Sequence, residues 1–224
     1  GFRLERQFGL RARLLPRVGV LPPTAFGEVR LGPFFYIAAT IGLGALAQES
    51  PDAMVKRVSQ EVLQIINSDP KVQAGDQQRI REVVETKLLP NFDFERLTAL
   101  AMGKNWRQAT PEQQKRLVEQ FRQLLVRTYS GALTQYRNQT MEYKPLRADA
   151  AATEVTMRTE VVRQGQAPVP IDYSMAKGPS GWKVYDVIVG GVSLVTNYRD
   201  EFNEQIKNGG VENLIKTLIA KNQG

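Results

Sequence analysis

The sequence contains no cysteine and no histidine in 224 residues. It therefore offers no thiol nucleophile, no imidazole base and no zinc site built from the usual thiolate and imidazole ligands. It also has no glycine-rich loop of the kind that holds phosphates. These absences predict a protein that is not an enzyme and that uses no cofactor, metal or nucleotide. A hydrolase that depends on two converging carboxylates is an alternative.

The excess of positive charge is also small once residues 1–47 are set aside. The net charge is +7, but residues 1–47 hold six Arg and two Glu, which leaves 24 basic and 21 acidic groups in residues 48–224. Nucleic-acid-binding domains carry clustered positive charge. The nearly balanced main part of the chain therefore predicts no nucleic-acid partner.

Only one long apolar run is present, at residues 34–47, where FFYIAATIGLGALA carries no charge and ends in an A-x-A pattern. This pattern predicts a secretory signal peptide that is cleaved after Ala47, with a buried N-terminal helix as the alternative. A membrane-spanning helix needs about 20 apolar residues, so no stable membrane insertion is expected. The chain thus divides into an N-terminal extension with the signal peptide, residues 1–47, and a domain, residues 48–224.

Helical periodicity indicates that helices come first in this domain. Apolar residues recur with a helical spacing in four segments that turn or cap residues bound, at 51–69, 76–90, 94–102 and 110–136. Ser50, Asp76 and Asp93 are the expected N-caps of the first three helices, and Thr110 with Gln113 forms a capping box for the longest. Two further helices are expected at 195–208 and 211–220, separated by a glycine pair.

Four segments with alternating or β-branched residues follow the long helix, at 140–148, 153–163, 169–177 and 182–189. Tight turns between them predict an antiparallel meander, and strands grouped apart from helices indicate an α+β fold. The expected fold has N-terminal helices, a twisted four-stranded sheet and two C-terminal helices.

The last predicted strand is apolar at every position but two, which predicts a central place in the sheet with both faces covered. Trp182, Val184 and Ile188 alternate there with Val187 and Val189. Asp186 lies among them, and a buried carboxylate needs partners. We expect it to pair with Arg199 or with backbone donors.

Six stretches carry a resemblance to a known family through their order and spacing. They read NFDF at 91–94, AMGKNWR at 101–107, TPEQQ at 110–114, FRQLLVRTY at 121–129, WKVYDV at 182–187 and GVSLVTNYR at 191–199. Together they resemble the MlaC family, also called the toluene-tolerance auxiliary protein family. Met102 departs from the pattern, since the family often has Leu before this glycine, and the resemblance does not reach residues 1–47.

The resemblance implies a soluble periplasmic carrier that shields the acyl chains of a phospholipid in an apolar cavity between a sheet and helices. Its implied partners are an outer-membrane lipoprotein complex and an inner-membrane ABC transporter complex with a substrate-binding ring. Lipid traffic between them would maintain the asymmetry of the outer membrane. The alternative is an α+β binding module without lipid, of cystatin-like or nuclear-transport-factor-like shape.

Eight residues of the long helix, of one face of the predicted sheet and of its last strand are candidates to line the cavity. They are Phe121, Leu125, Tyr129, Val155, Met157, Tyr173, Met175 and Val187. Each is also compatible with an ordinary core position. Methionine suits a variable surface such as an acyl chain because its side chain is flexible and polarisable. We therefore expect the sheet face that bears both methionines to look across a gap toward the long helix.

Overall fold

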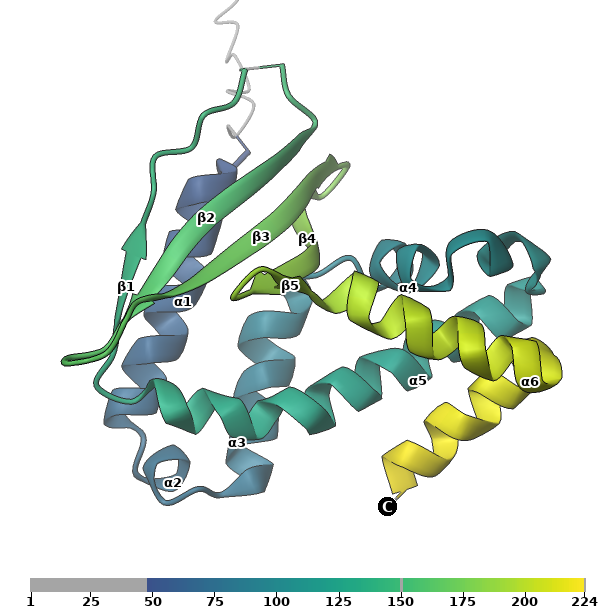
Figure 1. The fold of residues 1–224 in the computed structure, drawn as a ribbon. Coiled ribbons are helices and arrows are strands. Elements are labelled where there is room, and N and C mark those ends of the chain that lie inside the picture. The colour runs from purple at the N-terminus through teal and green to yellow at the C-terminus, as the bar shows by residue number, and fades with distance from the viewer. Residues whose placement is uncertain (1–47, 150, 224) are drawn as a thin grey trace, which may run out of the picture. The chain divides into compact units, whose positions relative to one another are not determined.

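The computed structural model describes residues 48–149 and 151–223. The expected signal peptide and its cleavage site lie outside the described residues. Five antiparallel strands and a set of helices confirm the α+β class (Figure 1). No helix among the described residues combines the length and the apolar character that crossing a bilayer requires.

The first helices form one arm of the fold. They are α1 (Pro51–Ser68), α2 (Pro70–Gln73), α3 (Gln77–Val83), the π-helical turn η1 (Val84–Leu88) and the 3₁₀ turn η2 (Leu89–Asn91). Asp76 caps α3 as predicted, because its carboxylate accepts from the backbone N–H groups of Gln78 and Arg79. Ser50 occupies the N-cap position of α1 as predicted, but its side chain makes no capping bond. The short α2, which the sequence did not reveal, is capped by Asp69.

The middle of the chain is also helical. It comprises α4 (Phe94–Met102), the 3₁₀ segment η3 (Gly103–Gln108), α5 (Pro111–Ser130) and the 3₁₀ segment η4 (Gly131–Tyr136). Helix α4 has the predicted bounds, with Asp93 as its cap. The capping box of Thr110 and Gln113 is present at the start of α5. The predicted long helix changes to 3₁₀ geometry at Gly131, because glycine is a poor residue for a helix interior.

The sheet is a meander in chain order, β1-β2-β3-β4-β5. Its strands are β1 (Thr140–Tyr143), β2 (Glu154–Val162), β3 (Val169–Gly178), β4 (Gly181–Val189) and β5 (Val192–Ser193). The prediction of four strands was one short, because a two-residue strand leaves no alternating pattern. Strand β1 also ends five residues before the predicted 148. Pro145 fixes φ near −65°, away from the extended strand value, and favours departure from the ladder.

A β-bulge in β4 changes which residues share a face of this strand. Met175 pairs with Val184 and Ser174 pairs with Asp186, so Tyr185 is the extra residue. A bulge of one residue exchanges the two faces of the strand beyond it. Consequently Val184 and Val187 share a face, although their spacing in sequence suggested opposite faces. Strand β4 is the fourth of five strands, and only a two-residue β5 borders its far side within the sheet.

The last helix, α6 (Leu194–Gln223), consists of two helices that meet at a sharp bend, as the sequence predicted. Gly209 and Gly210 break the helical backbone, and Gly210 has φ +73° and ψ −174°. That combination is essentially restricted to glycine.

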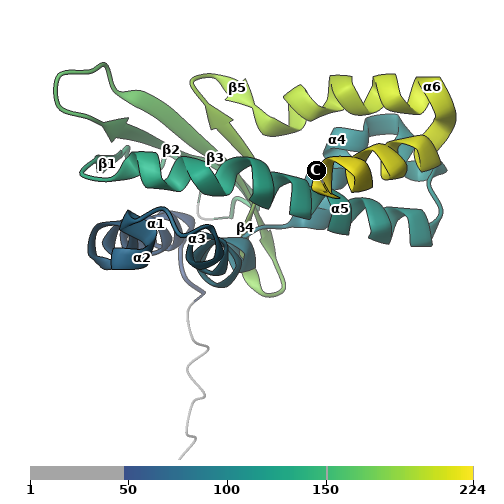
Figure 2. The same cartoon turned by 90° about the horizontal axis from the view of Figure 1, so that it is seen from below.

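Three groups of buried side chains hold these elements together. One joins α4, α5 and α6, a second joins α1 to one face of the sheet, and a third joins α1, α2 and α3. Helix α5 passes below the sheet and contacts α3 on one side and α4 and α6 on the other (Figure 2). Phe92 packs against the first and second groups, and Leu88 packs against the second and third.

Candidate functional site, an apolar pocket

A pocket of about 220 Å³ lies between β4, the η1 and η2 turns, the start of α4 and the C-terminal part of α5. Sixteen residues line it, and none carries a charged side chain. They are Val84, Leu88, Leu89, Phe92, Phe94, Leu97, Leu125, Val126, Tyr129, Ser130, Ala132, Leu133, Tyr136, Val187, Val189 and Leu194. The lining is suited to an apolar ligand, because it contains no group that would have to exchange water for a charge partner.

The link between η2 and α4 is fixed against the edge of β4, and this places two aromatic rings in the wall. Phe92 forms a parallel bridge with Val184, and the N–H of Asp93 donates to the carbonyl of Val184 at 2.8 Å. The rings of Phe92 and Phe94 stack with their centroids 5.7 Å apart. The NFDF stretch thus anchors α4 on the sheet and supplies part of the pocket surface.

The π-helical turn η1 forms another part of the wall. Its Val84 is buried and its Leu88 is half-buried, and both line the pocket. The Asn91 amide donates to the carbonyl of Lys87 at 2.7 Å and closes the end of the turn. Isolated π-helical turns are often found at functional sites, because they rotate side chains away from the regular helical positions.

The polar atoms of the lining do not create a polar site. The Ser130 hydroxyl donates to the carbonyl of Val126 within its own helix. Burial raises the pKa of Tyr198, which lies behind the wall, and the neighbouring Tyr129 adds to the shift. Both effects keep the phenol of Tyr198 neutral. Tyr129 and Val189 are 40% and 39% exposed, so they mark the side on which the pocket opens.

The structure distributes the eight predicted cavity residues over three places. Leu125, Tyr129 and Val187 line the pocket. Phe121 lies one turn before Leu125 in α5, in the helical cluster, where its ring centroid is 4.8 Å from those of Tyr198 and Phe202.

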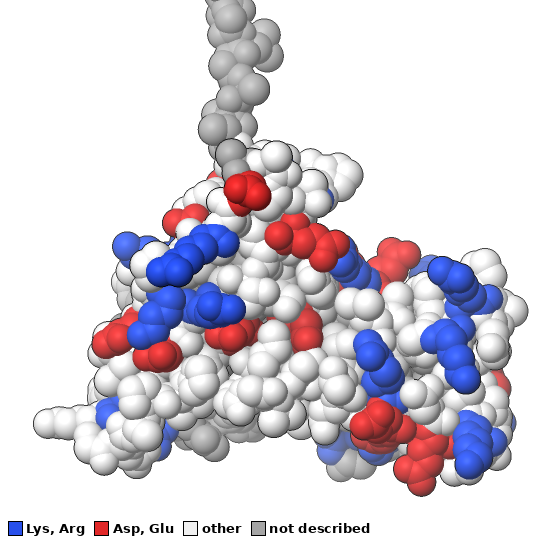
Figure 3. Space-filling model, turned by 45° about the horizontal axis from the view of Figure 1, so that its top comes forward, with Lys and Arg blue, Asp and Glu red and all other residues white. Residues whose placement is uncertain are grey.

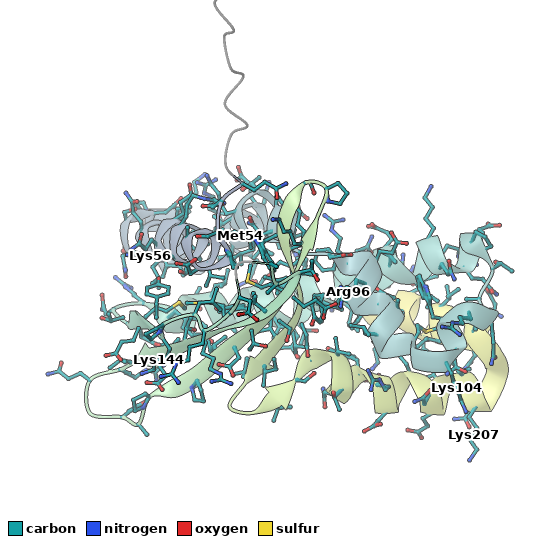
Figure 4. The ribbon with its side chains drawn as sticks, turned by 90° about the horizontal axis from the view of Figure 1, so that it is seen from above. Met54, Lys56, Arg96, Lys104, Lys144 and Lys207 are labelled. Carbon is teal, nitrogen blue, oxygen red and sulfur yellow. The ribbon has the colours of Figure 1, made fainter. Side chains whose placement is uncertain are left out.

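The four sheet candidates lie against α1. Val155, Met157 and Met175 belong to the group of buried residues that includes Met54 of α1, and Tyr173 packs against this group. Met54 projects from α1 toward the sheet (Figure 4). Helix α1 therefore occupies the position in which we expected a gap and the long helix. The pocket begins beyond the bulge, where Val187 and Val189 follow on the same face.

The remaining lining residues were not among the sequence candidates. Six of them come from the short segments η1, η2 and η4, which continue or follow predicted helices. The NFDF stretch was the available signal for Phe92 and Phe94, but nothing in the sequence indicated that they line a cavity. Leu194 reaches the pocket because β5 is only two residues long and α6 begins at once.

Asp186 points away from the pocket and has structural partners. Its carboxylate accepts from the Ser193 hydroxyl at 2.6 Å and from the backbone N–H of Val195 at 3.1 Å. Backbone N–H donors were one of the two kinds of partner predicted for Asp186. The other was wrong, because the Arg199 guanidinium donates to the carbonyl of Leu100 instead. Asp186 thus stabilises the start of α6.

Groups that could bind a metal or form a carboxylate pair are not found at this site. The described residues contain no cluster of three or more Asp and Glu side chains placed to hold a metal ion. None of the pocket residues is a carboxylic acid. Apart from the hydroxyl groups of Tyr129, Ser130 and Tyr136, the lining offers a ligand apolar contact.

The fold and the site define an α+β protein in which a twisted antiparallel sheet and helices surround an apolar pocket. The family model of the MlaC protein matches residues 56–220, so the chain belongs to the MlaC family. This confirms the resemblance carried by the six sequence stretches.

Curated relatives share about a quarter of their residues with this chain. It is 26% identical over 183 residues to the toluene tolerance protein ttg2D of Pseudomonas putida, with 81% of this chain and 84% of that protein covered. It is 24% identical over 188 residues to the intermembrane phospholipid transport system binding protein MlaC of Haemophilus influenzae, with 83% and 88% covered.

A solved structure is more similar in sequence. The phospholipid-binding protein from Ralstonia solanacearum, solved in complex with a phospholipid, is 44% identical. It matches with a TM-score of 0.72, over 77% of this chain and 96% of that chain.

Proposed function

We propose that this protein binds a phospholipid and carries it as part of a transport system. An acyl chain of the lipid occupies the pocket between β4 and α5. The observation that carries the proposal is the uncharged lining of sixteen residues, which opens beside Tyr129 and Val189. The phospholipid complex of the 44% identical Ralstonia protein supports the choice of ligand. No lining residue carries a carboxylate or an amine, which supports carriage rather than catalysis.

The energetics of acyl chains explain why such a carrier needs little else. Burial of each methylene contributes about 0.8 kcal/mol, so two chains of ordinary length contribute roughly 20 kcal/mol or more. A phospholipid therefore hardly exists free in water. A carrier has to come close to the burial that a bilayer offers without exceeding it greatly, because otherwise it could not release the lipid. Contacts to the head group can then be few.

The size of the pocket implies that its walls separate on loading. Its volume of about 220 Å³ is below the range of about 300–1,000 Å³ that is usual for sites of drug-sized molecules. Part of one acyl chain fits this space, whereas two chains do not. The wall elements meet at the edges of separate clusters, one centred on α4, α5 and α6 and another on α1 and the sheet. A small movement between these clusters would widen the pocket without opening either core.

The location and partners proposed for the protein follow from its relatives and from its sequence. The Haemophilus relative is called the binding protein of an intermembrane phospholipid transport system. We propose the periplasm as the location, reached through a signal peptide cleaved after Ala47. An outer-membrane lipoprotein complex and an inner-membrane ABC transporter complex are the proposed partners, and outer-membrane lipid asymmetry is the proposed outcome.

Lipid extraction tests the proposal directly. Wild-type protein purified from the periplasm is extracted with organic solvent, and the extract is examined by lipid mass spectrometry. We expect diacyl phospholipid in the extract, and an intact mass that begins at Gln48. Protein that is folded by circular dichroism but yields no diacyl lipid would favour the alternative of a binding module without lipid.

A further inference from the structure

Strand β2 extends well beyond its partner β1. The β1–β2 ladder runs from Thr140 paired with Val162 to Tyr143 paired with Thr159. One more bond follows, from the N–H of Lys144 to the carbonyl of Arg158 at 3.0 Å. The remaining part of β2, down to Glu154, is paired with β3 alone. This part of the sheet edge is therefore open.

The open edge presents unpaired backbone groups at Thr156. Because the Arg158 carbonyl points toward β1, the N–H and carbonyl of Thr156, two residues away, point to the same side. They do not take part in the β2–β3 ladder. Among the described residues, none of the backbone atoms of 145–149 bonds to Thr156. An exposed edge of this kind is a template for another strand.

A groove of about 910 Å³ runs along this edge. Its walls are β2 on one side and the connection from Lys144 to Asp149 on the other, and Tyr185 lies at one end. Leu146 packs against the buried group that α1 shares with the sheet, which holds the connection beside β2 without pairing to it. The groove thus has the place and direction of a missing strand.

The charges around the groove favour an acidic occupant. Arg147 and Arg158 line it, and neither has an ion-pair partner within the described part of the chain, although Arg158 stands opposite Asp172 in the β2–β3 register. Glu154 is already paired with Arg96 at 2.8 Å. Lys144 is held by Glu160 at 2.8 Å. Asp149 is the remaining lining carboxylate, so two guanidiniums face one unpaired acid. Figure 3 shows Lys and Arg side chains gathered over this part of the sheet.

We infer that this groove binds an extended acidic segment of a partner protein, which adds to the open edge of β2 as a strand. Backbone bonds to Thr156 supply the register, and acidic side chains of the segment meet Arg147 and Arg158. The inference is independent of the lipid, since the groove and the apolar pocket share no lining residue.

The test uses a fluorescein-labelled peptide of alternating Thr and Glu, about eight residues long as in an ordinary strand, and the full mature protein. Binding is measured by fluorescence anisotropy at low and moderate salt. The double variant Arg147→Glu with Arg158→Glu should weaken binding at least about tenfold, because like charges then face each other. The matched control is Lys104→Glu with Lys207→Glu, the same change in net charge at the α4 and α6 end of the molecule (Figure 4), and it should change binding less than about twofold.

Strand addition is separated from plain charge attraction by removing the backbone donor. Thr156→Pro deletes the outward N–H while leaving the β2–β3 ladder bonds, and it should weaken binding about fivefold or more. Because Thr156→Pro also constrains φ, a second test removes backbone donors from the peptide instead of from the protein. It uses a peptide that is N-methylated at alternate residues. That peptide should bind no better than a peptide of alternating Thr and Lys.

The outcomes are distinct. Loss of binding with both the arginine variant and the N-methylated peptide supports the inference. Equal binding of the methylated and unmodified peptides overturns it, since attraction would then be electrostatic alone. Binding of vesicles with anionic lipid through the same arginines, without peptide binding, also overturns it, as does a dimer of the wild-type chain that Thr156→Pro dissociates.

Discussion

Substitution by tryptophan at two positions of the same sheet face distinguishes the pocket from the core. Val187 lines the pocket, whereas Met175 is fully buried against α1. In Val187→Trp, about seven added atoms enter the pocket, and if they displace about five methylenes of the lipid, the lost burial is roughly 4 kcal/mol. That is a loss of about a thousandfold in affinity. The stripped protein should keep its melting temperature, because the indole fills space that is otherwise empty.

Met175→Trp should have the opposite effects. Overpacking a closed core costs about 1–3 kcal/mol, which for a domain of this size lowers the melting temperature by several degrees, at roughly 2–4 °C per kcal/mol. Its lipid content should stay near that of the wild type. The assay is lipid per protein by mass spectrometry, paired with thermal unfolding of delipidated protein. If Met175→Trp loses lipid without loss of stability, and Val187→Trp does the reverse, the acyl chains lie against α1 and our placement of the ligand is refuted.

Two further predictions concern stability. Arg96 lowers the pKa of Glu154 by hydrogen bonding, so the stabilisation is present above the ordinary glutamate pKa and is lost as the pH falls through the lowered value. The melting temperatures of wild type and Glu154→Gln should therefore differ at neutral pH and converge as the pH falls through the lowered pKa; a gap that widens in acid would contradict this. Gly210→Ala, which forces a side chain into a glycine-only conformation, should destabilise by about 1–3 kcal/mol, whereas Gly131→Ala at φ −63° should be neutral or slightly stabilising in thermal unfolding.

Much of the fold could be predicted because local signals and tertiary structure agree. Asp76, Asp93 and Thr110 cap helices as expected, since a side-chain oxygen at these positions satisfies N–H groups that the helix leaves free. The break at Gly209 and Gly210 was equally readable. Such signals act over three or four residues and need no knowledge of the rest of the chain.

The pocket was harder to predict because its lining depends on long-range placement. Leu125 and Tyr129 could be selected from the apolar face of a long helix. Val155 and Met157 share a sheet face with Val187, and the sequence does not reveal that α1 covers them. Alternation identifies which residues turn inward, but it does not say which helix they meet. The η1 and η4 turns that complete the wall lie within predicted helices, and the sequence does not reveal that their apolar residues face a pocket.

The bulge in β4 explains how one strand serves two parts of the molecule. Before it, Val184 packs into the group shared with α1, and after it Val187 faces the pocket on the same side of the sheet. Tyr185 turns outward, where Arg96 lies 4.0 Å above its ring. Asp186 then lies on the face opposite to Val187, where it holds the start of α6 through Val195. Strict alternation would have put Val184 and Asp186 on one face and Val187 on the other, so either the core residue or the pocket residue would have been lost. The extra residue therefore lets the sheet contribute to a closed core and to an open apolar site with the same face.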